Sequence, residues 1–179
     1  MLPTSVTLRD GRRAILRVAR SSDAERLTVM NRAILVETDF HIREADEYSG
    51  DLQGERRFIE QMAGTSDALY LLGLIDDEIA GLLLFQRERY RRMRHGGNLG
   101  LAVRVGYQQR GLGTALLERF LDWVRTRPGI EKVKLEVFST NHVAQKIYER
   151  LGFVVEGVRQ GDVRVKGRAV DLILMAKYL

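Results

Sequence analysis

The 179-residue sequence contains no cysteine, and this absence removes several kinds of chemistry. Without cysteine the chain has no disulfides, no thiolate metal ligands and no cysteine nucleophile. The three histidines, His41, His95 and His142, also lack the spacing of metal ligands, so we expect no metal site. A chain without cysteine fits a reducing compartment, and we therefore expect a cytoplasmic protein.

Long apolar runs are missing as well. The longest, LYLLGLI and IAGLLLF, are far shorter than the roughly 20 residues of a membrane-spanning helix. The first residues, MLPTSVTLRDGRR, lack the apolar core of a signal peptide. We therefore expect no membrane partner. Prolines number only two and no repeat or Pro/Ser-rich linker interrupts the chain, which predicts one domain over residues 1–179.

Positive charge exceeds negative charge, with 29 Lys and Arg against 24 Asp and Glu. The resulting pI of about 9.7 favours anionic partners without choosing among them. The densest basic patch, RERYRRMRH, carries five arginines between residues 87 and 94. A module that binds nucleic acid or an acidic protein is one interpretation. It is disfavoured as the main activity because Tyr90 is the one aromatic side chain in the patch on which a base could stack.

Apolar periodicity and turn residues predict the secondary structure. Asp10-Gly11 between two strand-like runs is typical of a hairpin, and Ser22 and Glu25 have the spacing of a capping box. Strands and helices alternate with hairpins, which predicts a mixed α/β (α+β) fold with a mostly antiparallel sheet of about 6–7 strands and about four helices. Leu27, Met30 and Ile34 share one face of the first predicted helix, the other helices are predicted at 55–63, 111–125 and 141–150, and strands beyond the first hairpin are predicted at 69–75, 79–85, 98–105, 132–138, 153–160 and 169–179.

The segment GYQQRGLGTALLERFLDWV places three glycines, Gly106, Gly111 and Gly113, where a strand enters a helix. Glycine there costs roughly 1 kcal/mol of helix stability against alanine. In return, several backbone N–H groups point at one spot, where the helix dipole adds positive potential and no side chain blocks a phosphate. Arg110 adds charge. The junction predicts a cradle for a pyrophosphate-sized anion, and a tight turn without a ligand is the simple alternative.

Two familiar phosphate-binding motifs do not fit this junction. A P-loop requires Gly-Lys followed by Ser or Thr, whereas Leu112 follows Gly111. The dinucleotide-binding pattern requires Gly or Ala where Leu116 stands. The cradle must therefore belong to another class of site.

Two motifs carry a resemblance to a known family. QQRGLG, with Gln108, Gly111 and Gly113, matches Gln/Arg-x-x-Gly-x-Gly/Ala, the acyl-CoA pyrophosphate motif of the GCN5-related N-acetyltransferases (GNAT superfamily). About 30 residues downstream, NHVAQKIYERLGFVVEG resembles the second motif of that family, with Asn, Ala and Tyr on one helix before Leu-Gly-Phe and Glu-Gly. The resemblance covers residues 98–179 and is looser over 6–97. The sequence is most similar to the bacterial branch that includes ribosomal-protein and small-amine acetyltransferases.

The resemblance implies the GNAT fold and transfer of an acetyl group from acetyl-CoA to a primary amine. The acceptor is a small molecule or a protein N-terminus, and the amine attacks directly within a ternary complex, which agrees with the lack of a cysteine nucleophile. A non-catalytic acyl-CoA-binding protein of the same fold remains an alternative. The arginines of residues 87–94 then serve the CoA 3′-phosphate, a protein substrate, a partner subunit or only solvent. A homodimer formed through the C-terminal strands is expected by analogy alone.

The resemblance also implies where the cofactor binds. A splayed strand before the cradle would expose its backbone to the pantetheine arm, with a main-chain N–H near Val103 as oxyanion donor. Residues 108–114 would hold the pyrophosphate, with Thr114 as a hydroxyl donor, and Asn141 aligns with a pantetheine contact while equally fitting a plain N-cap. The implied cofactor-binding residues are Leu101, Val103, Arg104, Val105, Gln108, Gln109, Arg110, Gly111, Leu112, Gly113, Thr114, Asn141, Ala144 and Tyr148.

Tyr148 aligns with the general acid of the family. A phenol with a pKa near 10 can give a proton to a thiolate whose acid has a pKa of about 8.5. Tyr148 also lies on an apolar stripe with Ala144 and Ile147, so its spacing alone equally fits a core residue.

The general base is left open by the sequence. Glu37, His95 and Glu136 are the candidates, and a water chain to solvent is an equal alternative. The family commonly builds its acceptor pocket after the first helix, in AILVETDFHIREAD. Glu37 and Phe40 are therefore the candidate substrate-binding residues, although Phe40 equally fits the core.

Overall fold

A computed structural model describes residues 1–179, and its strands all belong to one sheet. The strand order is β1-β2-β3-β4-β5-β6-β8-β7, and every neighbouring pair is antiparallel except β5 and β6. The strands are β1 (Thr4–Thr7), β2 (Arg13–Val18), β3 (Ala68–Ile75), β4 (Glu78–Arg87), β5 (Gly96–Val103), β6 (Lys132–Phe138), β7 (Val154–Val165) and β8 (Arg168–Tyr178), and the α-helices are α1 (Ala24–Glu37), α2 (Leu52–Ala63), α3 (Leu112–Arg125) and α4 (His142–Arg150).

The expected mixed, mostly antiparallel sheet and the four helices are confirmed. The expected count of about 6–7 strands was too low, because the sheet has eight. The N-terminal hairpin adds its two strands to one edge of the sheet, and the C-terminal hairpin adds its two strands to the other edge.

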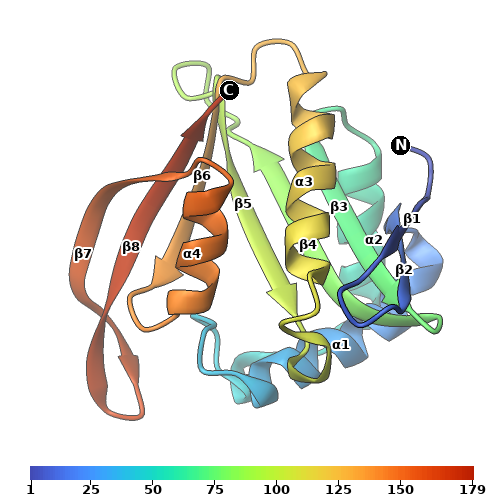
Figure 1. Cartoon of the computed structure of the whole chain (residues 1–179), viewed down its shortest axis with the longest axis horizontal. Helices are drawn as coiled ribbons and strands as arrows, with labels where there is room; N and C mark the ends of the chain where they lie inside the picture. Colours follow the sequence, from blue (N-terminus) through green and yellow to red (C-terminus); the bar gives the residue numbers. More distant parts are fainter.

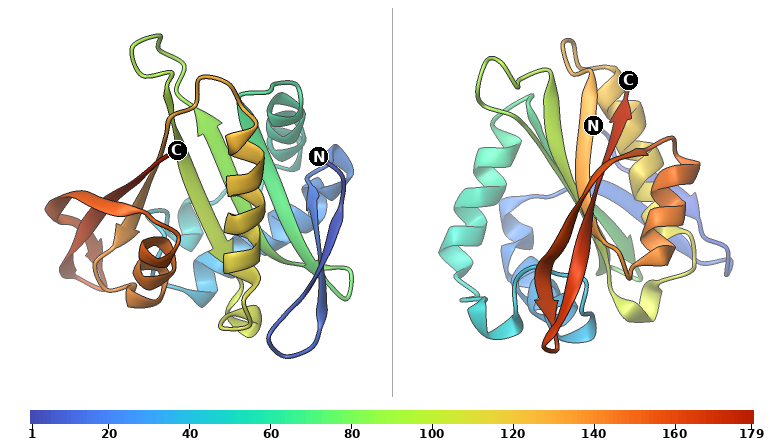
Figure 2. Two further views of the ribbon diagram at one scale, coloured as in Figure 1. Left: turned by 45° about the horizontal axis from the view of Figure 1, so that its top comes forward. Right: turned by 90° about the vertical axis from the view of Figure 1, so that its left-hand side faces the viewer.

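The sheet is sandwiched between two pairs of helices. Helices α1 and α2 cover one face and α3 and α4 the other, as the right-hand view of Figure 2 shows edge-on. A cluster of 24 buried residues joins α3 and α4 to the sheet, and a separate cluster of 12 joins α1 and α2 to the opposite face. No helix is both long and apolar enough to cross a membrane.

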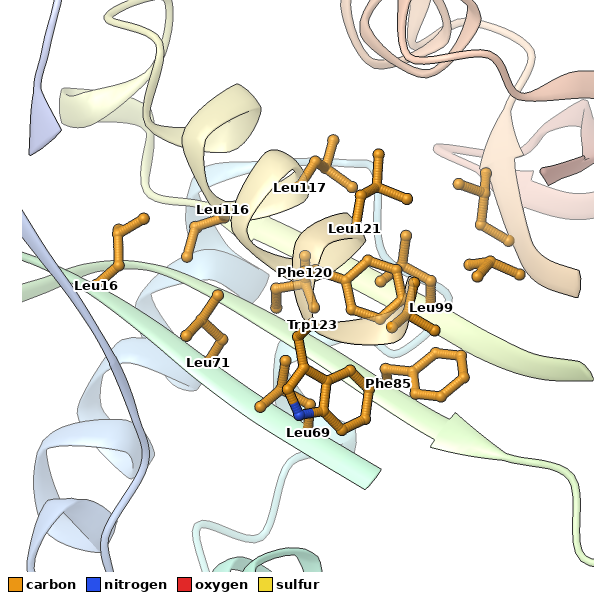
Figure 3. Packing of buried hydrophobic residues seen from close by; sticks show 14 of the residues in the cluster. Leu16, Leu69, Leu71, Phe85, Leu99, Leu116, Leu117, Phe120, Leu121 and Trp123 are labelled. Carbon is orange, nitrogen blue, oxygen red and sulfur yellow. The ribbon is translucent and has the colours of Figure 1, made fainter. Parts of the chain in front are cut away.

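Helix α3 lies where its apolar stripe predicts. Its Leu112, Leu116 and Phe120 are at most 1% exposed and belong to the core cluster that includes residues of β2 to β5. Figure 3 shows Leu116 and Phe120 on the side of α3 that faces the strands. The ring of Phe120 lies 5.1 Å from that of Phe85. This packing fixes the start of α3, and with it the cradle, against the centre of the sheet.

Both predicted tight turns are present. Residues 10–11 form the tip between β1 and β2, where Gly11 has a φ of 84°. Asp76 and Asp77 join β3 to β4 with φ values of 51° and 64°, the two positive angles of a type I′ turn.

The predicted capping box at Ser22 and Glu25 is wrong. A 3-10 turn over Ser21–Asp23 precedes α1, and Asp23 takes the N-cap position. The Asp23 carboxylate accepts hydrogen bonds from Arg17 (2.6 and 2.7 Å) and from the Arg20 backbone (2.8 Å). Helix α2 also begins at Leu52 rather than at 55, because the Asp51 side chain caps it by accepting from Gln53 N.

Candidate active site at the seam of the sheet

Strands β5 and β6 separate soon after they meet. They pair only at Gly96–Lys132, Gly97–Val133 and Asn98–Lys134, and then diverge toward the lower edge of the view in Figure 1. We call the opening between residues 99–103 of β5 and 135–138 of β6 the β5–β6 gap.

The β5–β6 gap exposes backbone groups of β5. Hydrogen bonds from Glu88 N to Gly96 O (2.9 Å) and from Arg104 N to Ala80 O (3.0 Å) stand at the two ends of the β4–β5 ladder. In an antiparallel pair, every second residue of a strand forms hydrogen bonds with a given neighbouring strand. Since Gly96 and Arg104 both bond to β4, the even-numbered residues of β5 form their backbone hydrogen bonds with β4. The odd-numbered residues 99–103 therefore direct their N–H and C=O groups toward the gap, including the Val103 N–H expected to act as oxyanion donor.

The cradle, residues 108–114, lies at the end of this gap. The N–H groups of Gln109, Arg110 and Gly111 donate to no protein acceptor. Those of the first helical turn, 112–114, have no intrahelical acceptor by geometry. Side chains cap α2 and α4, whereas α3 begins at Gly111 without a side-chain cap. Up to six successive donors are thus left for an anion.

Glycine at position 111 is required by conformation rather than by room. Its φ of 94° lies in the left-handed region, where a side chain is strained. A Cβ there would lie 3.6 Å from Arg9 Cγ, an ordinary contact. Gln109 also has a positive φ, 61°. The chain therefore turns sharply here, and the turn aims consecutive N–H groups at one place.

The charged side chains of the cradle are anchored to the N-terminal hairpin. Arg110 Nη1 lies 2.8 Å from Asp10 Oδ2, and Arg9 N donates to Arg110 O at 2.9 Å. Asp10 also pairs with Arg12. No local sequence pattern indicates this contact, because the two residues are 100 positions apart. Arg110 is therefore partly neutralised rather than free beside the predicted phosphate position.

The other cradle side chains also have partners. Gln108 Nε2 donates to Val103 O (2.9 Å), tying the cradle to the last residue of β5. Thr114 Oγ1 accepts from Arg150 Nη2 (3.0 Å) and keeps its own proton for an acceptor. Leu112 is 1% exposed, so only its backbone is available to a ligand.

Tyr148 lies in the core on the α3/α4 side of the sheet. It is 6% exposed, and its ring centroid lies 5.7 Å from that of Phe153. Burial raises the pKa of Tyr148 to about 12, and its hydroxyl makes no hydrogen bond to the protein. Tyr148 is therefore packed in the core, as its spacing predicted, and its phenol is protonated and has no protein partner.

Asn141 is the N-cap of α4. Its Oδ1 accepts from Ala144 N at 3.2 Å, which confirms the capping interpretation. Its side-chain amide N–H groups have no protein acceptor and remain available to a ligand. Ala144 packs beside Tyr148 against the core.

A cavity of about 740 Å³ opens beside the cradle. Four segments line it. They are residues 37–40 at the end of α1, Val105 and Gln108 between β5 and α3, Thr140 after β6, and Val165, Lys166, Arg168 and Val170 of the β7–β8 hairpin. We call it the acceptor-side cavity. It brings the two predicted substrate residues, Glu37 and Phe40, together, and it adds hairpin residues that no local sequence pattern marked.

Glu37 is held in place by Arg104 and Val105, which lie between β5 and the cradle. Its carboxylate accepts from Arg104 Nη2 (2.9 Å), Arg104 Nε (3.2 Å) and Val105 N (3.0 Å). Burial raises the pKa of Glu37, but these hydrogen bonds outweigh burial and the net pKa is lowered. A lowered pKa weakens Glu37 as a proton acceptor and favours a positioning role.

His95 and the arginine patch lie at the wrong end of the sheet for this site. His95 precedes the first residue of β5, whereas the cradle follows its last, roughly 25 Å along the strand. The patch forms the turn between β4 and β5, where Arg87 and Arg94 both pair with Asp67. His95 and the patch therefore lie at the end of β5 that is remote from the cradle, which argues against His95 as a base.

Glu136 lies on β6 along the β5–β6 gap. Leu135 and Val137 belong to the core under α3 and α4, so the intervening side chain of Glu136 points to the opposite face. Phe138, two residues on, shares that face and contacts Phe40 of the acceptor-side cavity, with ring centroids 6.3 Å apart. Glu136 itself pairs with Arg159.

Comparison with known proteins agrees with this geometry. Residues 36–153 match the family model for the acetyltransferase (GNAT) family. The L-amino acid N-acetyltransferase AaaT of Escherichia coli is 26% identical over 118 residues, which cover 66% of this chain and 73% of that protein. The [ribosomal protein bS18]-alanine N-acetyltransferase of E. coli is 38% identical over 76 residues, and there the match spans only 51% of the relative's length.

Solved structures show the same architecture. An acetyltransferase of the GNAT family from Streptococcus pneumoniae superimposes with a TM-score of 0.89 at 27% identity, covering 93% of this chain and 99% of that one. Groups of three or more His, Asp or Glu that could hold a metal ion are absent.

The family-model match and these similarities show that the chain belongs to the acetyltransferase (GNAT) family and is an acetyl-CoA-dependent N-acetyltransferase.

Proposed function

We propose that the β5–β6 gap holds the pantetheine arm of acetyl-CoA and that the cradle holds its pyrophosphate. The observation that carries this proposal is the run of unpartnered N–H groups over 109–114, which continues the free backbone edge of residues 99–103. Six donors at the positive end of α3 match a diphosphate in charge and in hydrogen-bonding capacity. The Asn141 amide, at the start of α4, serves the other side of the arm.

The same strand edge supplies the electrophilic half of the site. Bound acetyl-CoA supplies an acetyl thioester as the acyl donor. The Val103 N–H faces the gap and donates to the carbonyl oxygen as that oxygen gains negative charge. Gln108, which donates to Val103 O, fixes the orientation of this end of β5.

Glu136 is proposed as the general base. Of the three candidates it alone combines a place on the β5–β6 gap with a side chain on the face of the acceptor-side cavity. His95 is too far away. Glu37 accepts three hydrogen bonds, from Arg104 and from Val105 N, whereas Glu136 has a single ion pair, with Arg159 of the exposed strand β7. Glu136 removes a proton from the acceptor ammonium, directly or through one water, and leaves a neutral amine to attack.

Tyr148 is proposed as the general acid. With a pKa raised to about 12 by burial, the phenol stays protonated throughout the neutral range. Its hydroxyl has no protein partner, so its hydrogen bond is available to a sulfur that gains negative charge. Tyr148 stabilises the leaving thiolate and gives it a proton, while the attacking nitrogen releases its second proton to solvent and solvent restores the phenol.

The acceptor, the assembly and the location complete the proposal. The two bacterial relatives are named for acetylating L-amino acids and a ribosomal-protein alanine, so free amino acids and protein N-termini are the two acceptor classes to consider. We propose a single domain over residues 1–179, cytoplasmic action, and a homodimer through the edge strand β7, where Val154, Val155 and Val158 are about half exposed.

The experiment compares Tyr148→Phe and Glu136→Gln with the unchanged enzyme in steady-state acetylation. Tyr148→Phe removes only the hydroxyl, so acetyl-CoA affinity should be retained while kcat falls about 100-fold. Glu136→Gln should lower kcat similarly. The matched controls are Tyr178→Phe and Glu88→Gln, whose side chains lie outside the gap and pair with Glu156 and Lys134.

Two outcomes contradict the assignments. Unchanged kcat in Tyr148→Phe would leave this tyrosine with a structural role only. Binding of acetyl-CoA without acetylation of any amine by the unchanged enzyme would instead favour the non-catalytic acyl-CoA-binding alternative.

A further inference from the structure

The acceptor-side cavity contains one charged side chain that the protein leaves unpaired. Glu37 pairs with Arg104, and Asp39 pairs with Lys166 across the cavity mouth. Arg168 also lines the cavity, yet its guanidinium makes no ion pair and no hydrogen bond with the protein. The cavity therefore presents one unpaired positive charge, at Arg168.

The β7–β8 hairpin fixes the direction of Arg168. Its turn consists of Lys166 and Gly167, both with positive φ (49° and 79°), so Arg168 pairs directly with Val165. Alternate residues of β8 share a face, which groups Arg168 with Val170 and then with Leu172, the residue opposite Phe138. This is the face that carries Glu136 and the acceptor-side cavity.

The remaining lining combines four apolar side chains with the polar Thr38, Gln108 and Thr140. Phe40, Val105, Val165 and Val170 surround the charged positions. Such walls favour an uncharged acceptor side chain. A planar guanidinium among them favours a carboxylate, which it binds through two parallel hydrogen bonds. An unpaired cation also repels an acceptor with several ammonium groups, such as a polyamine.

We propose that Arg168 binds the carboxylate of the acceptor and that the preferred acceptor is a free amino acid with an apolar side chain. This inference rests on the proposed function of the site and names its substrate class. Arg168 is then a specificity-determining residue contributed by the β7–β8 hairpin. Its role is to recognise the acceptor, and the transfer chemistry itself does not require it.

The test uses acceptors that differ only in the carboxylate. Free L-amino acids, led by L-leucine, are compared with their amides, with the decarboxylated amine 3-methylbutylamine and with short peptides that begin with alanine, following CoA release. Arg168→Gln should raise KM for leucine about 10- to 100-fold, with little change in kcat. The kinetics with 3-methylbutylamine should not change.

The decisive quantity is the ratio of kcat/KM for leucine to that for leucinamide, compared between the unchanged enzyme and Arg168→Gln. This comparison cancels the different basicity of the two amines. The matched control is Arg164→Gln, because Arg164 lies on the same hairpin, pairs with Ala169 and is absent from the cavity lining. The ratio should fall in Arg168→Gln and remain constant in Arg164→Gln.

The inference and the proposed function fail in different ways. An equal loss with leucine and leucinamide in Arg168→Gln, or acetylation of peptides but not of free amino acids, overturns the carboxylate assignment and leaves the transferase intact. No acetylation of any amine overturns the proposed function itself.

Discussion

Strands β3 and β7 show how differently the two halves of the sheet are stabilised. All eight residues of β3 are buried, whereas none of the twelve residues of β7 is. Strand β3 lies between helices on both faces, while the β7–β8 hairpin extends past the edge of α4 (Figure 1). Burial on both faces concentrates hydrophobic stabilisation in the half of the sheet formed by β1 to β5. The other half, formed by β6, β8 and β7, presents more polar and charged side chains at its edge.

The proposed active site lies where these halves meet. The well-packed half contributes β5 and the start of α3, whose free N–H groups need a fixed direction to be useful. The open half contributes Glu136, Arg168 and the wall of the acceptor-side cavity. Three parallel residue pairs connect the halves along β5 and β6, and the opening beyond them makes room for a ligand between two strands.

The largest contrast between the halves should appear in stability. Leu71 on β3 is completely buried, so Leu71→Ala should lower the free energy of unfolding by about 3 kcal/mol. Val158 on β7 is 49% exposed, and Val158→Ala should change it by less than about 0.5 kcal/mol. Urea unfolding followed by circular dichroism measures both. A cost at Val158 comparable to that at Leu71 would mean that β7 is covered, as in the proposed dimer.

A second contrast concerns the cradle itself. Gly111→Glu places a strained side chain and a negative charge among the unpartnered N–H groups, so it should abolish the stabilisation by acetyl-CoA. For the unchanged enzyme that stabilisation is about 2.7 kcal/mol at a ligand concentration 100 times Kd. Thermal unfolding with and without acetyl-CoA provides the measurement.

The control for this experiment is Gly161→Glu in β7. Gly161 also has a positive φ (59°), so the control adds the same charge and a similar backbone strain away from the cradle. It should retain the full shift with acetyl-CoA. Equal losses in both variants would show that strain, rather than occupation of the cradle, removes the effect.

The sequence predicted the parts of this molecule that depend on local pattern. The stripe of Leu112, Leu116 and Phe120 located α3, and the glycines after β5 located the cradle, because periodicity and backbone freedom are properties of neighbouring residues. The alternation of KVKLEVF gave β6 with its correct bounds.

Long-range contacts could not be predicted in the same way. Asp10 meets Arg110, and Lys166 pairs with Asp39 after α1, only because the fold brings together segments that are distant in the sequence. The capping box failed for a related reason: Arg17, on the preceding strand, holds Asp23 and sets the start of the helix. The choice of Glu136 as the proposed general base also required the three-dimensional structure, since Glu37, His95, Glu136 and a water chain were all left open by the sequence.

The smallest expected effect is at the contact between the N-terminal hairpin and the cradle. Asp10→Asn removes the partner of Arg110 and leaves that guanidinium free to face the anionic ligand. The Kd for acetyl-CoA should fall about two- to fivefold at low salt, and the difference should fade at high salt because exposed charges are screened. Calorimetric titration at two salt concentrations measures this. The control, Asp122→Asn, breaks an exposed pair with Arg125 at the opposite end of α3 and should leave Kd unchanged. Weaker binding by Asp10→Asn would instead mean that the pair between Asp10 and Arg110 holds the cradle in shape. The well-packed half of the sheet would then support the cradle through the N-terminal hairpin as well as through α3.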